Sequence, residues 1–406
     1  MKRYIERALE PVLAQAAREF PALILTGPRQ SGKTTLLKHL FGRDYGYVSL
    51  QLSDVGAAAR EDPRTFLARF PPPVIYDEIQ YAPELLSYVK ELIDTNRDRP
   101  GQFILTGSQN LLLMEAVSES LAGRAAVFRL LPLSRREAQG RTQAPFLWET
   151  GTPETDGPDA SPEEFWKEVL RGSYPELVAN PDRDWGLWHS GYVQTYLERD
   201  VRTLRQVGDL TQFQSFLRAL AARTGQLLNL SELARDLGVA VNTAKAWLSV
   251  LEATHQVIIL RPYFANIGKR LVKTPKTYFV DLGTLCHLTG LSDPAHAARG
   301  PMAGQIMETA VLGEIVKTFW NRGREPEVYF WRTSRGDEVD FLVRAGTTLI
   351  PLEVKLSATP RPTMAASIIR LQDEMGDGVG HGYVINPGVG TLPLGAGVTA
   401  AGFRHL

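Results

Sequence analysis

Short apolar runs alternate with helical patterns over the first third of the chain. The apolar runs are ALILTG, YGYVSL, PPVIYDE, QFILTGS and AAVFRLLPL. Strands that alternate with helices are typical of a parallel sheet whose faces are covered by helices. Residues 1–140 are therefore predicted to form an α/β domain.

The pattern changes several times after this domain. Residues 141–160 are rich in Pro, Gly, Thr and acidic residues with little periodicity, which indicates a linker or surface loop. Residues 161–205 have a helical pattern. Residues 206–290 are helical and then strand-like, and residues 295–406 open with a helix and continue as strands. We therefore expect a helical segment followed by two further domains.

Acidic and basic residues balance in the composition. Among 406 residues, Lys and Arg number 45 and Asp and Glu number 45, so the formal net charge is zero. A nucleic-acid surface would therefore have to be a local basic patch. Cys286 is the only cysteine, which excludes an intramolecular disulfide and a cysteine-based zinc site and fits a cytoplasmic protein. No run of about 18 apolar residues occurs, so no membrane partner is expected.

The stretch GPRQSGKT follows an apolar run and precedes the helical pattern TTLLKHL. It fits G-x-x-x-x-G-K-[ST], in which glycines let backbone N–H groups surround phosphate oxygens at the start of a helix. Lys33 would neutralise the β- and γ-phosphates, and Thr34 would ligate Mg²⁺. A chance glycine turn is the alternative, which the order of strand, loop and helix disfavours. The predicted nucleotide contacts are Gly27, Pro28, Arg29, Gln30, Ser31, Gly32, Lys33, Thr34 and Thr35.

Acidic and polar residues end two further apolar runs. The run VIYDE ends in Asp77, which would hold Mg²⁺ through water, and Glu78, which would orient or deprotonate the attacking water. Solvated turn acids are the alternative. The run FILTGS ends in Ser108, a candidate sensor of the γ-phosphate. Arg124 is the candidate for a cation supplied by a neighbouring subunit and Arg199 is the second candidate, although a lone arginine is more often a surface charge.

Several stretches together resemble one family. They are LTGPRQSGKTTLL, YDEIQ, LTGSQNLLL, LAGR…LPLSRREA and TYLERDVRTL. They are similar to AAA-type ATPases of bacteria and archaea that carry a C-terminal domain of unknown function. The resemblance covers nearly the whole chain. It implies ATP rather than GTP, a helical lid over the α/β domain, and a homo-oligomer for which a hexameric ring is one arrangement.

Residues 227–263 predict two helices joined by a turn at Gly238, capped by Ser231 and by Asn242 or Thr243. The runs HQVIILRPYF and KTYFVDL then predict an extended pair, which completes the outline of a winged helix-turn-helix. The second helix offers few groups that read bases, so DNA contact is expected mainly at the phosphate backbone. A winged helix used for packing or protein contacts is the alternative. The candidate DNA-binding residues are Asn242, Thr243, Lys245, Lys269, Arg270, Lys273 and Lys276.

The run DEVDFLVRAGTTLIPLEVKL predicts two strands near the C-terminus. Glu353 and Lys355 share one strand face because side chains alternate, and strand pairing could set Asp340 beside them. Two carboxylates would hold a divalent metal that activates water, and the lysine would polarise the nucleophile. Glu308 in the preceding helix would complete the metal shell, with Glu314 as the second choice.

This order of residues resembles the PD-(D/E)xK nuclease fold of Holliday-junction resolvases and restriction endonucleases. The resemblance implies a restriction-endonuclease-like α/β domain, with Glu308, Asp340, Glu353 and Lys355 as catalytic candidates. A nuclease-like scaffold kept as a binding module is the alternative.

Three functional hypotheses follow. The first is a Mg²⁺-dependent ATPase that binds duplex or branched, Holliday-junction-like DNA and couples hydrolysis to its remodelling or translocation, with cutting left open. The second is a nucleotide-dependent switch that acts through protein–protein contacts. The third is mainly a nuclease that ATP gates.

Overall fold

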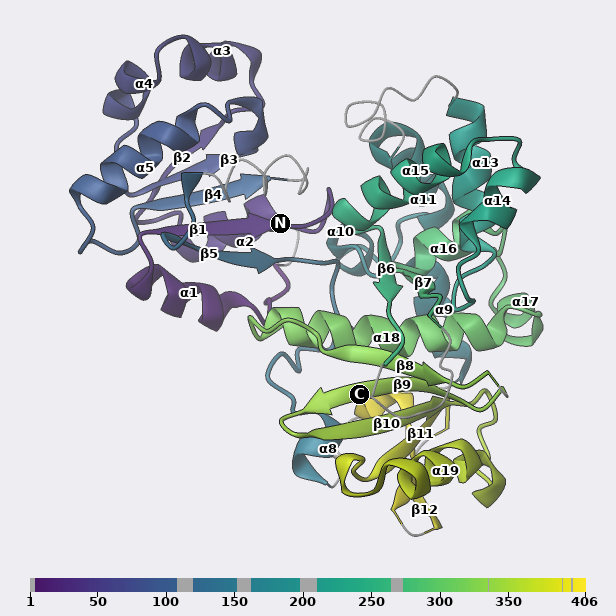
Figure 1. Cartoon of the computed structure of the whole chain (residues 1–406). Helices are drawn as coiled ribbons and strands as arrows, with labels where there is room; N and C mark the ends of the chain where they lie inside the picture. Colours follow the sequence, from purple (N-terminus) through teal and green to yellow (C-terminus); the bar gives the residue numbers. More distant parts are fainter. Residues whose placement is uncertain are drawn as a thin grey trace.

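The computed structural model describes residues 4–107, 120–151, 162–197, 210–263, 273–334, 336–388, 390–395 and 397–406. Four predicted site residues lie outside these ranges: Ser108, Arg199, Lys269 and Arg270. Figure 1 shows an N-terminal body built on strands β1–β5 beside a larger body that holds the remaining strands.

The N-terminal body contains a five-stranded sheet in the order β2-β3-β4-β1-β5. All of its strand pairings are parallel. The strands are β1 (Ala22–Thr26), β2 (Gly46–Ser49), β3 (Val74–Asp77), β4 (Phe103–Gly107) and β5 (Ala125–Arg129). The parallel α/β fold predicted for this part of the chain is confirmed.

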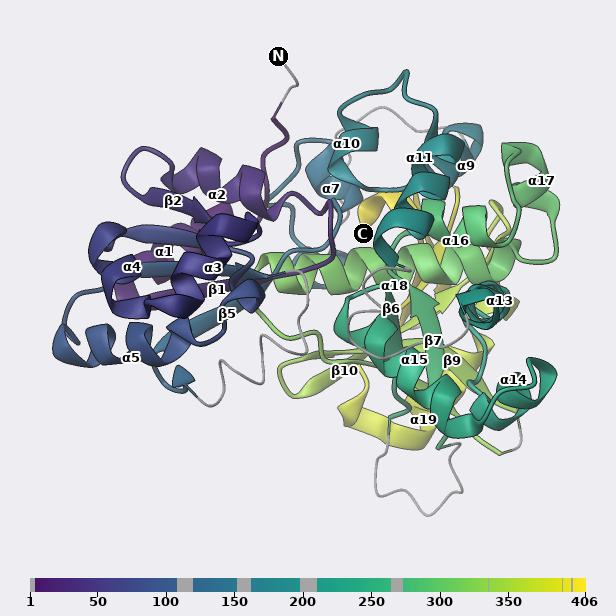
Figure 2. The same cartoon turned by 90° about the horizontal axis from the view of Figure 1, so that it is seen from above.

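Helices cover both faces of this sheet (Figure 2). Ile24 and Leu105 point to the face covered by α3, α4 and α5, whereas Leu23 and Leu25 point to the face covered by α1 and α2. The inner strands β3, β4 and β1 are buried on both faces, so they are continuous apolar runs and do not alternate with polar residues. The helices are α1 (Glu10–Glu19), α2 (Lys33–Phe41), α3 (Ser53–Glu61), α4 (Pro63–Arg69), η1 (Ile79–Tyr81) and α5 (Leu85–Thr95).

A set of short helices leads from this sheet into the larger body. We call α9, α10, α11 and η2 the lid segment. Part of the predicted linker is helical: Leu147 is buried in α8, and the Phe146 ring packs 5.3 Å from that of Phe319. The elements are α7 (Arg135–Ala138), α8 (Leu147–Thr150), α9 (Pro162–Arg171), α10 (Pro175–Val178), α11 (Trp185–Tyr192) and the π-helix η2 (Val193–Leu197).

Three helices and a strand pair follow, which we call the middle segment. Asn229, and not Ser231, caps the second helix, because its side chain accepts a hydrogen bond from the Glu232 N–H at 3.1 Å. Asn242 and Thr243 lie inside the first turn of the third helix, and the residue before that helix is Ala240. The elements are α13 (Leu210–Ala221), α14 (Leu230–Asp236), α15 (Val241–Ala253) and the antiparallel strands β6 (Val257–Leu260) and β7 (Lys276–Phe279).

The C-terminal domain, α18 to β13, has a six-stranded mixed sheet in the order β12-β13-β11-β10-β9-β8. Two short helices, α16 (Leu282–Leu288) and α17 (Pro294–Arg299), precede it. Its longer elements are α18 (Ala303–Asn321), β8 (Val328–Arg332), β9 (Glu338–Ala345), β10 (Thr348–Val354), α19 (Ala366–Met375), β11 (Gly382–Asn386), β12 (Thr391–Gly395) and β13 (Val398–Gly402). Short 3-10 turns lie at Pro362–Ala365, Gly376–Gly378 and Phe403–His405.

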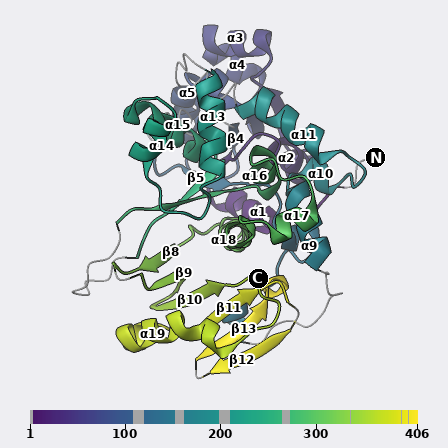
Figure 3. The same ribbon diagram turned by 90° about the vertical axis from the view of Figure 1, so that its right-hand side faces the viewer.

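One apolar cluster runs through the lid segment, the middle segment and the C-terminal domain, whereas the N-terminal sheet has clusters of its own. Figure 3 looks along α18, which lies between the helices of the lid and middle segments and the β8–β13 sheet. Trp247 of α15 and Ile306 and Leu312 of α18 belong to the shared cluster. The larger body therefore has one main core, with two smaller clusters where α19 packs on the C-terminal sheet, and the N-terminal body is a second unit beside it.

Candidate functional site

The predicted phosphate loop joins the carboxyl end of β1 to the start of α2, which begins at Lys33. Gly27 has φ of 145°, and a Cβ there would lie 2.1 Å from the carbonyl oxygen of Leu130. Gly32 has φ of 94°. Both positions therefore require glycine, and the loop directs the amino end of α2 toward a bound anion.

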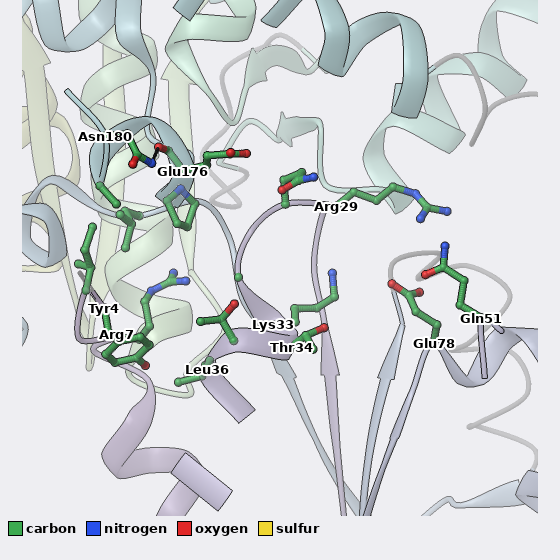
Figure 4. A pocket seen from close by; sticks show the side chains of 17 residues that line it. Tyr4, Arg7, Arg29, Lys33, Thr34, Leu36, Gln51, Glu78, Glu176 and Asn180 are labelled. Atoms are coloured by element: carbon green, nitrogen blue, oxygen red, sulfur yellow. Dashed lines mark hydrogen bonds between the residues drawn. The ribbon is translucent and has the colours of Figure 1, made fainter. Parts of the chain in front are cut away.

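A cavity of about 470 Å³ lies between this loop and the lid segment. Arg29, Gln30, Gly32, Lys33, Thr34 and Thr35 line it from the loop. Figure 4 shows Glu78 and Gln51 on one side of Lys33 and Thr34, and Tyr4, Arg7, Glu176 and Asn180 on the other. The other predicted residues of the loop, Gly27, Pro28 and Ser31, do not line the cavity. The Lys33 ammonium donates to the carbonyl oxygens of Gly27 at 2.8 Å and Pro28 at 3.0 Å, and the Ser31 side chain is buried.

Asp77 ends β3 next to Thr34. The Thr34 hydroxyl donates to Asp77 Oδ2 at 2.9 Å, the Tyr47 hydroxyl donates to the same oxygen at 2.6 Å, and Thr106 donates to Oδ1. Burial and the bond to Asp77 raise the pKa of Tyr47, so this hydroxyl stays a donor at neutral pH. Hydroxyl and carboxylate oxygens are the ligands that Mg²⁺ prefers, so Thr34 and Asp77 fit a nucleotide-bound Mg²⁺.

Glu78 has left-handed backbone geometry, with φ of 59°. Its N–H donates to Thr106 Oγ1 at 3.2 Å, and the Gln80 amide donates to its carboxylate. Such a backbone conformation costs energy and persists where neighbouring contacts enforce it. The result is a carboxylate that lines the nucleotide cavity beside Asp77. No role was predicted for Thr106 or Gln80 from the sequence, although both lie inside the quoted runs FILTGS and YDEIQ.

Arg7 is a further residue that sequence reasoning missed. Its guanidinium donates to Glu137 Oε1 at 2.9 Å, to the Ser31 carbonyl at 2.9 Å and to the Leu131 carbonyl at 2.8 Å. Burial raises the pKa of Glu137, but Arg7 and the N–H groups of Ser134 and Ala8 outweigh burial and hold it below its usual value. Arg7 thus joins the N-terminal segment, the phosphate loop and the segment after β5.

Arg124 directly precedes β5, at the amino edge of the parallel sheet, whereas the phosphate loop follows the carboxyl end of β1. Its guanidinium pairs with both carboxylate oxygens of Asp94, at 2.7 and 3.0 Å. Arg124 therefore lies across the sheet from the nucleotide cavity of its own chain. A catalytic role for it requires a neighbouring subunit and stays a prediction.

The predicted DNA-binding residues divide into two groups. Asn242 and Lys245 are exposed and Thr243 is half-buried near the amino end of α15, and Lys273 is exposed just before β7. Lys276 does not belong with them. It is the first residue of β7, its ammonium is buried, and it pairs with acids of the C-terminal domain, so it is not available to a DNA phosphate.

The predicted nuclease-like residues meet in one acidic cluster. Phe341 of β9 pairs with Leu352 of β10, which places Asp340 opposite Glu353 one step further along the same antiparallel register. Lys355 pairs with Glu353 at 2.5 Å, and Asp340 Oδ2 accepts the Val354 N–H at 2.8 Å.

Other helices and strands also contribute charged side chains to this cluster. Glu308 of α18 accepts from the Tyr278 hydroxyl at 3.2 Å, and Glu338 pairs with Lys276 at 2.6 Å and with Arg332 at 3.0 Å. Burial and the nearby Asp340 charge raise the pKa of Glu308 to about 8 and likewise the pKa of Glu353 to about 8. The second-choice acid, Glu314, lies elsewhere on α18 and accepts from the Arg135 N–H. Within the described ranges, no group of three or more His, Cys, Asp or Glu side chains is arranged to hold a metal ion.

A parallel sheet with a G-x-x-x-x-G-K-T loop after β1 and an acid pair at the end of β3, one strand beyond the neighbour of β1, defines a P-loop ATPase. Residues 19–139 match the family described as an AAA domain. Residues 162–295 and 303–406 match two domains of unknown function, DUF8612 and DUF4143. An uncharacterized protein of Mycobacterium tuberculosis is 32% identical over 395 residues, which cover 96% of this chain and 81% of that protein. An uncharacterized protein of Mycobacterium bovis matches with the same values. The chain belongs to the family of these mycobacterial proteins.

Two solved structures are similar in part. A Walker-type ATPase of Pyrococcus abyssi aligns at a TM-score of 0.45 and 16% identity, covering 70% of this chain and 96% of that chain. A RuvB variant of Thermotoga maritima aligns at a TM-score of 0.27 and 17% identity, covering 62% of this chain and 85% of that chain. A helix long and apolar enough to cross a membrane is absent from the described part of the chain.

Proposed function

We propose that the protein is a Mg²⁺-dependent ATPase that couples ATP hydrolysis to the binding and remodelling of duplex or branched DNA. One observation carries this proposal: the nucleotide cavity lies between the phosphate loop and the lid segment, and the lid segment shares its core with the middle segment. A change at the nucleotide would therefore move the middle segment together with the lid.

The roles of the nucleotide-site residues follow from their positions. In this structure the Lys33 ammonium donates to loop carbonyl oxygens. When ATP is bound, the ammonium would contact the β- and γ-phosphates in place of those carbonyls. Thr34 and Asp77 would hold Mg²⁺, which would supply charge neutralisation at the phosphates. Glu78 directs the attacking water, because its carboxylate is the acidic group next to Asp77 that lines the cavity.

A structural change at the nucleotide would reach the larger body through contacts around the cavity. Pro175 and Asn180 of the lid segment line the cavity opposite Glu78. Behind the phosphate loop, the Lys317 ammonium of α18 donates to the Leu133 carbonyl at 3.0 Å and to the Ser173 hydroxyl at 3.0 Å. These buried bonds join the end of the nucleotide-binding half to the helix at the centre of the larger body.

DNA would contact exposed residues of the middle segment, in the part predicted to form a winged helix. Asn242, Lys245 and Lys273 are exposed there, and none of them takes part in the buried pairs described above. An exposed lysine of this segment contributes to the affinity for DNA phosphates, and to the salt dependence of binding, more than to base recognition. In a homo-oligomer, Arg124 would reach the nucleotide of the next subunit.

The test is ATP turnover without DNA and with single-stranded DNA, linear duplex and a four-way junction. We expect duplex or junction DNA to raise turnover several-fold. Lys33→Ala should lower turnover about 100-fold or more, with or without DNA. Lys245→Ala should remove much of the stimulation and leave basal turnover unchanged. Lys167→Ala is the matched control, since that lysine lies on α9 with a side chain that is 57% exposed. If DNA neither binds nor changes turnover, the proposed coupling is wrong.

A nucleotide-dependent switch that acts through protein contacts is the second candidate. The observation that favours it is apolar exposure: Leu187 of α11 is 76% exposed and Val241, the first residue of α15, is 45% exposed. Apolar side chains at such positions suit a protein partner better than a phosphate backbone. Turnover that is slow and indifferent to DNA, with loss of a bound protein in Lys33→Ala, would favour this candidate.

A further inference from the structure

The acidic cluster of the C-terminal domain contains a cation from another part of the chain. Lys276, on strand β7 of the middle segment, places its ammonium 2.6 Å from Glu338 Oε1 and 3.7 Å from Glu308 Oε2. We infer that Lys276 takes the place that a divalent metal would have in this cluster and fastens the middle segment to the C-terminal domain. The inference is independent of the proposed coupling to DNA.

The geometry of β7 directs two side chains into the cluster. Lys276 and Tyr278 are two positions apart, so they point to the same side of the strand. The Tyr278 hydroxyl donates to Glu308 Oε2 at 3.2 Å, and the Lys276 ammonium also lies 5.5 Å from the centre of the Phe330 ring. The side chain of Lys276 is only 5% exposed. An ammonium so deeply buried is stable only beside acids, and here the acids belong to α18 and β9.

Charge balance explains why this lysine is needed. Four carboxylates converge from α18, β9 and β10: Glu308, Glu338, Asp340 and Glu353. The C-terminal domain supplies two cations of its own, because Lys355 pairs with Glu353 and Arg332 pairs with Glu338. Among the described ion pairs, neither Glu308 nor Asp340 has a cation of that domain as its partner. Burial raises the pKa of both acids and Lys276 lowers it, so without Lys276 these two buried groups would lack a counter-charge whenever they ionise.

The acids retain some capacity for a metal. Glu353 Oε2 is buried and has no hydrogen-bond partner, and Asp340 lies opposite Glu353 in the strand register. Carboxylate oxygens of this kind are ligands for Mg²⁺ or Mn²⁺. With the ammonium in place, however, the donor set does not fit a divalent ion, since Glu308 and Glu338 are engaged by Lys276. An ammonium cannot act as a Lewis acid toward water or phosphate, so we derive no phosphodiester cleavage at this cluster.

Mn²⁺ binding to the nucleotide-free protein tests the inference without reference to activity. Titration calorimetry and the electron paramagnetic resonance of free Mn²⁺ would compare wild type, Lys276→Met, and Lys276→Met combined with Asp340→Asn. We expect no Asp340-dependent binding in wild type. Lys276→Met should bind one Mn²⁺, with an affinity at least tenfold above the detection limit that wild type does not reach at this site, and the double variant should lose this binding. Lys273→Met is the matched control, because that lysine is exposed three residues earlier.

Thermal unfolding supplies a second readout. Lys276→Met should melt at a lower temperature than wild type without metal, and Mn²⁺ should raise its melting temperature while leaving that of wild type unchanged. If Lys276→Met does not fold, Lys276→Gln and the comparison of wild type with Asp340→Asn still decide the question. Asp340-dependent Mn²⁺ binding by wild type would overturn the inference. So would a folded Lys276→Met protein that binds no Mn²⁺.

Discussion

Arg7→Met tests whether the buried pair of Arg7 and Glu137 holds the phosphate loop in place. The substitution keeps much of the side-chain volume but removes the charge and three hydrogen bonds, to Glu137, to the Ser31 carbonyl and to the Leu131 carbonyl. The Arg7 side chain is 4% exposed and that of Glu137 is fully buried. We therefore expect Glu137 to remain as a buried carboxylate without its cation.

The magnitude follows from this burial. Removing one partner of a buried ion pair costs about 3–5 kcal/mol of unfolding free energy, because the other charge is left uncompensated. By contrast, the pair of Arg64 and Glu91 is 70% and 55% exposed, and its loss should cost less than about 1 kcal/mol. Arg64→Met is thus a matched control in the same N-terminal body. Since Arg7 also binds the Ser31 carbonyl, ATP affinity should fall in Arg7→Met and not in Arg64→Met.

The assay is urea denaturation followed by far-ultraviolet circular dichroism, with ATP affinity measured in parallel. None of the seven tryptophans lies in residues 1–140, so tryptophan fluorescence reports the larger body separately. The loss should also depend on pH. Arg7 and neighbouring N–H groups lower the pKa of Glu137 in the folded protein, so this group stabilises wild type above its unfolded pKa, and the stabilisation disappears as pH falls through the folded value.

The variant should respond to acid in the opposite direction. Without Arg7, burial raises the folded pKa of Glu137, and protonation removes the unpaired charge. The difference in stability between wild type and Arg7→Met should therefore shrink from neutral pH toward about pH 4. Adding Glu137→Gln to Arg7→Met should recover part of the loss. A loss below about 1 kcal/mol, or a loss that does not change with pH, would refute the reasoning.

Four further outcomes are expected. Lys33→Ala should lower ATP turnover about 100-fold or more in a phosphate-release assay, because a cation at the transferring phosphate is lost. Glu78→Gln should slow hydrolysis by about 100- to 10,000-fold while ATP binding persists, and equal losses of both would contradict its assigned role. Gly27→Ala should cost about 1–3 kcal/mol and weaken ATP binding, since its Cβ would lie 2.1 Å from the Leu130 carbonyl. Trp247→Ala, at a position 4% exposed, should destabilise the larger body by about 3–5 kcal/mol in thermal unfolding and leave the N-terminal body unchanged.

The fold of the N-terminal body could be predicted because its signals are local. The runs that form the inner strands β1, β3 and β4 are buried on both faces, and the phosphate loop needs its glycines and its Lys33 within a few consecutive residues. Asp77 and Glu78 could be predicted because they directly follow an apolar run. The carboxyl ends of parallel strands meet at one edge of the sheet, so these acids were expected near the phosphate loop. Helix caps were harder to place, since Asn229 and Ser231 are both suitable capping residues and only two positions separate them.

The residues that sequence reasoning missed or misplaced depend on distant contacts. Arg7 and Glu137 are 130 positions apart, and nothing in either local sequence marks them as a pair. Lys276 lies in a basic stretch that suggests phosphate contact, yet strand β7 turns its ammonium into the acids of the C-terminal domain. The sequence shows that a side chain is charged, but whether that side chain is buried depends on which helices and strands pack against it.

The sequence by itself determined the class of the protein, a P-loop ATPase, because phosphate binding is made by consecutive residues with special backbone geometry. It also determined that Glu353 and Lys355 share a strand face, because side chains alternate along a strand. Only the tertiary structure decided that the lid segment, the middle segment and the C-terminal domain share one main core, and that Lys276 pairs with Glu308 and Glu338. Both outcomes depend on surfaces that are far apart in the chain and are brought together by packing.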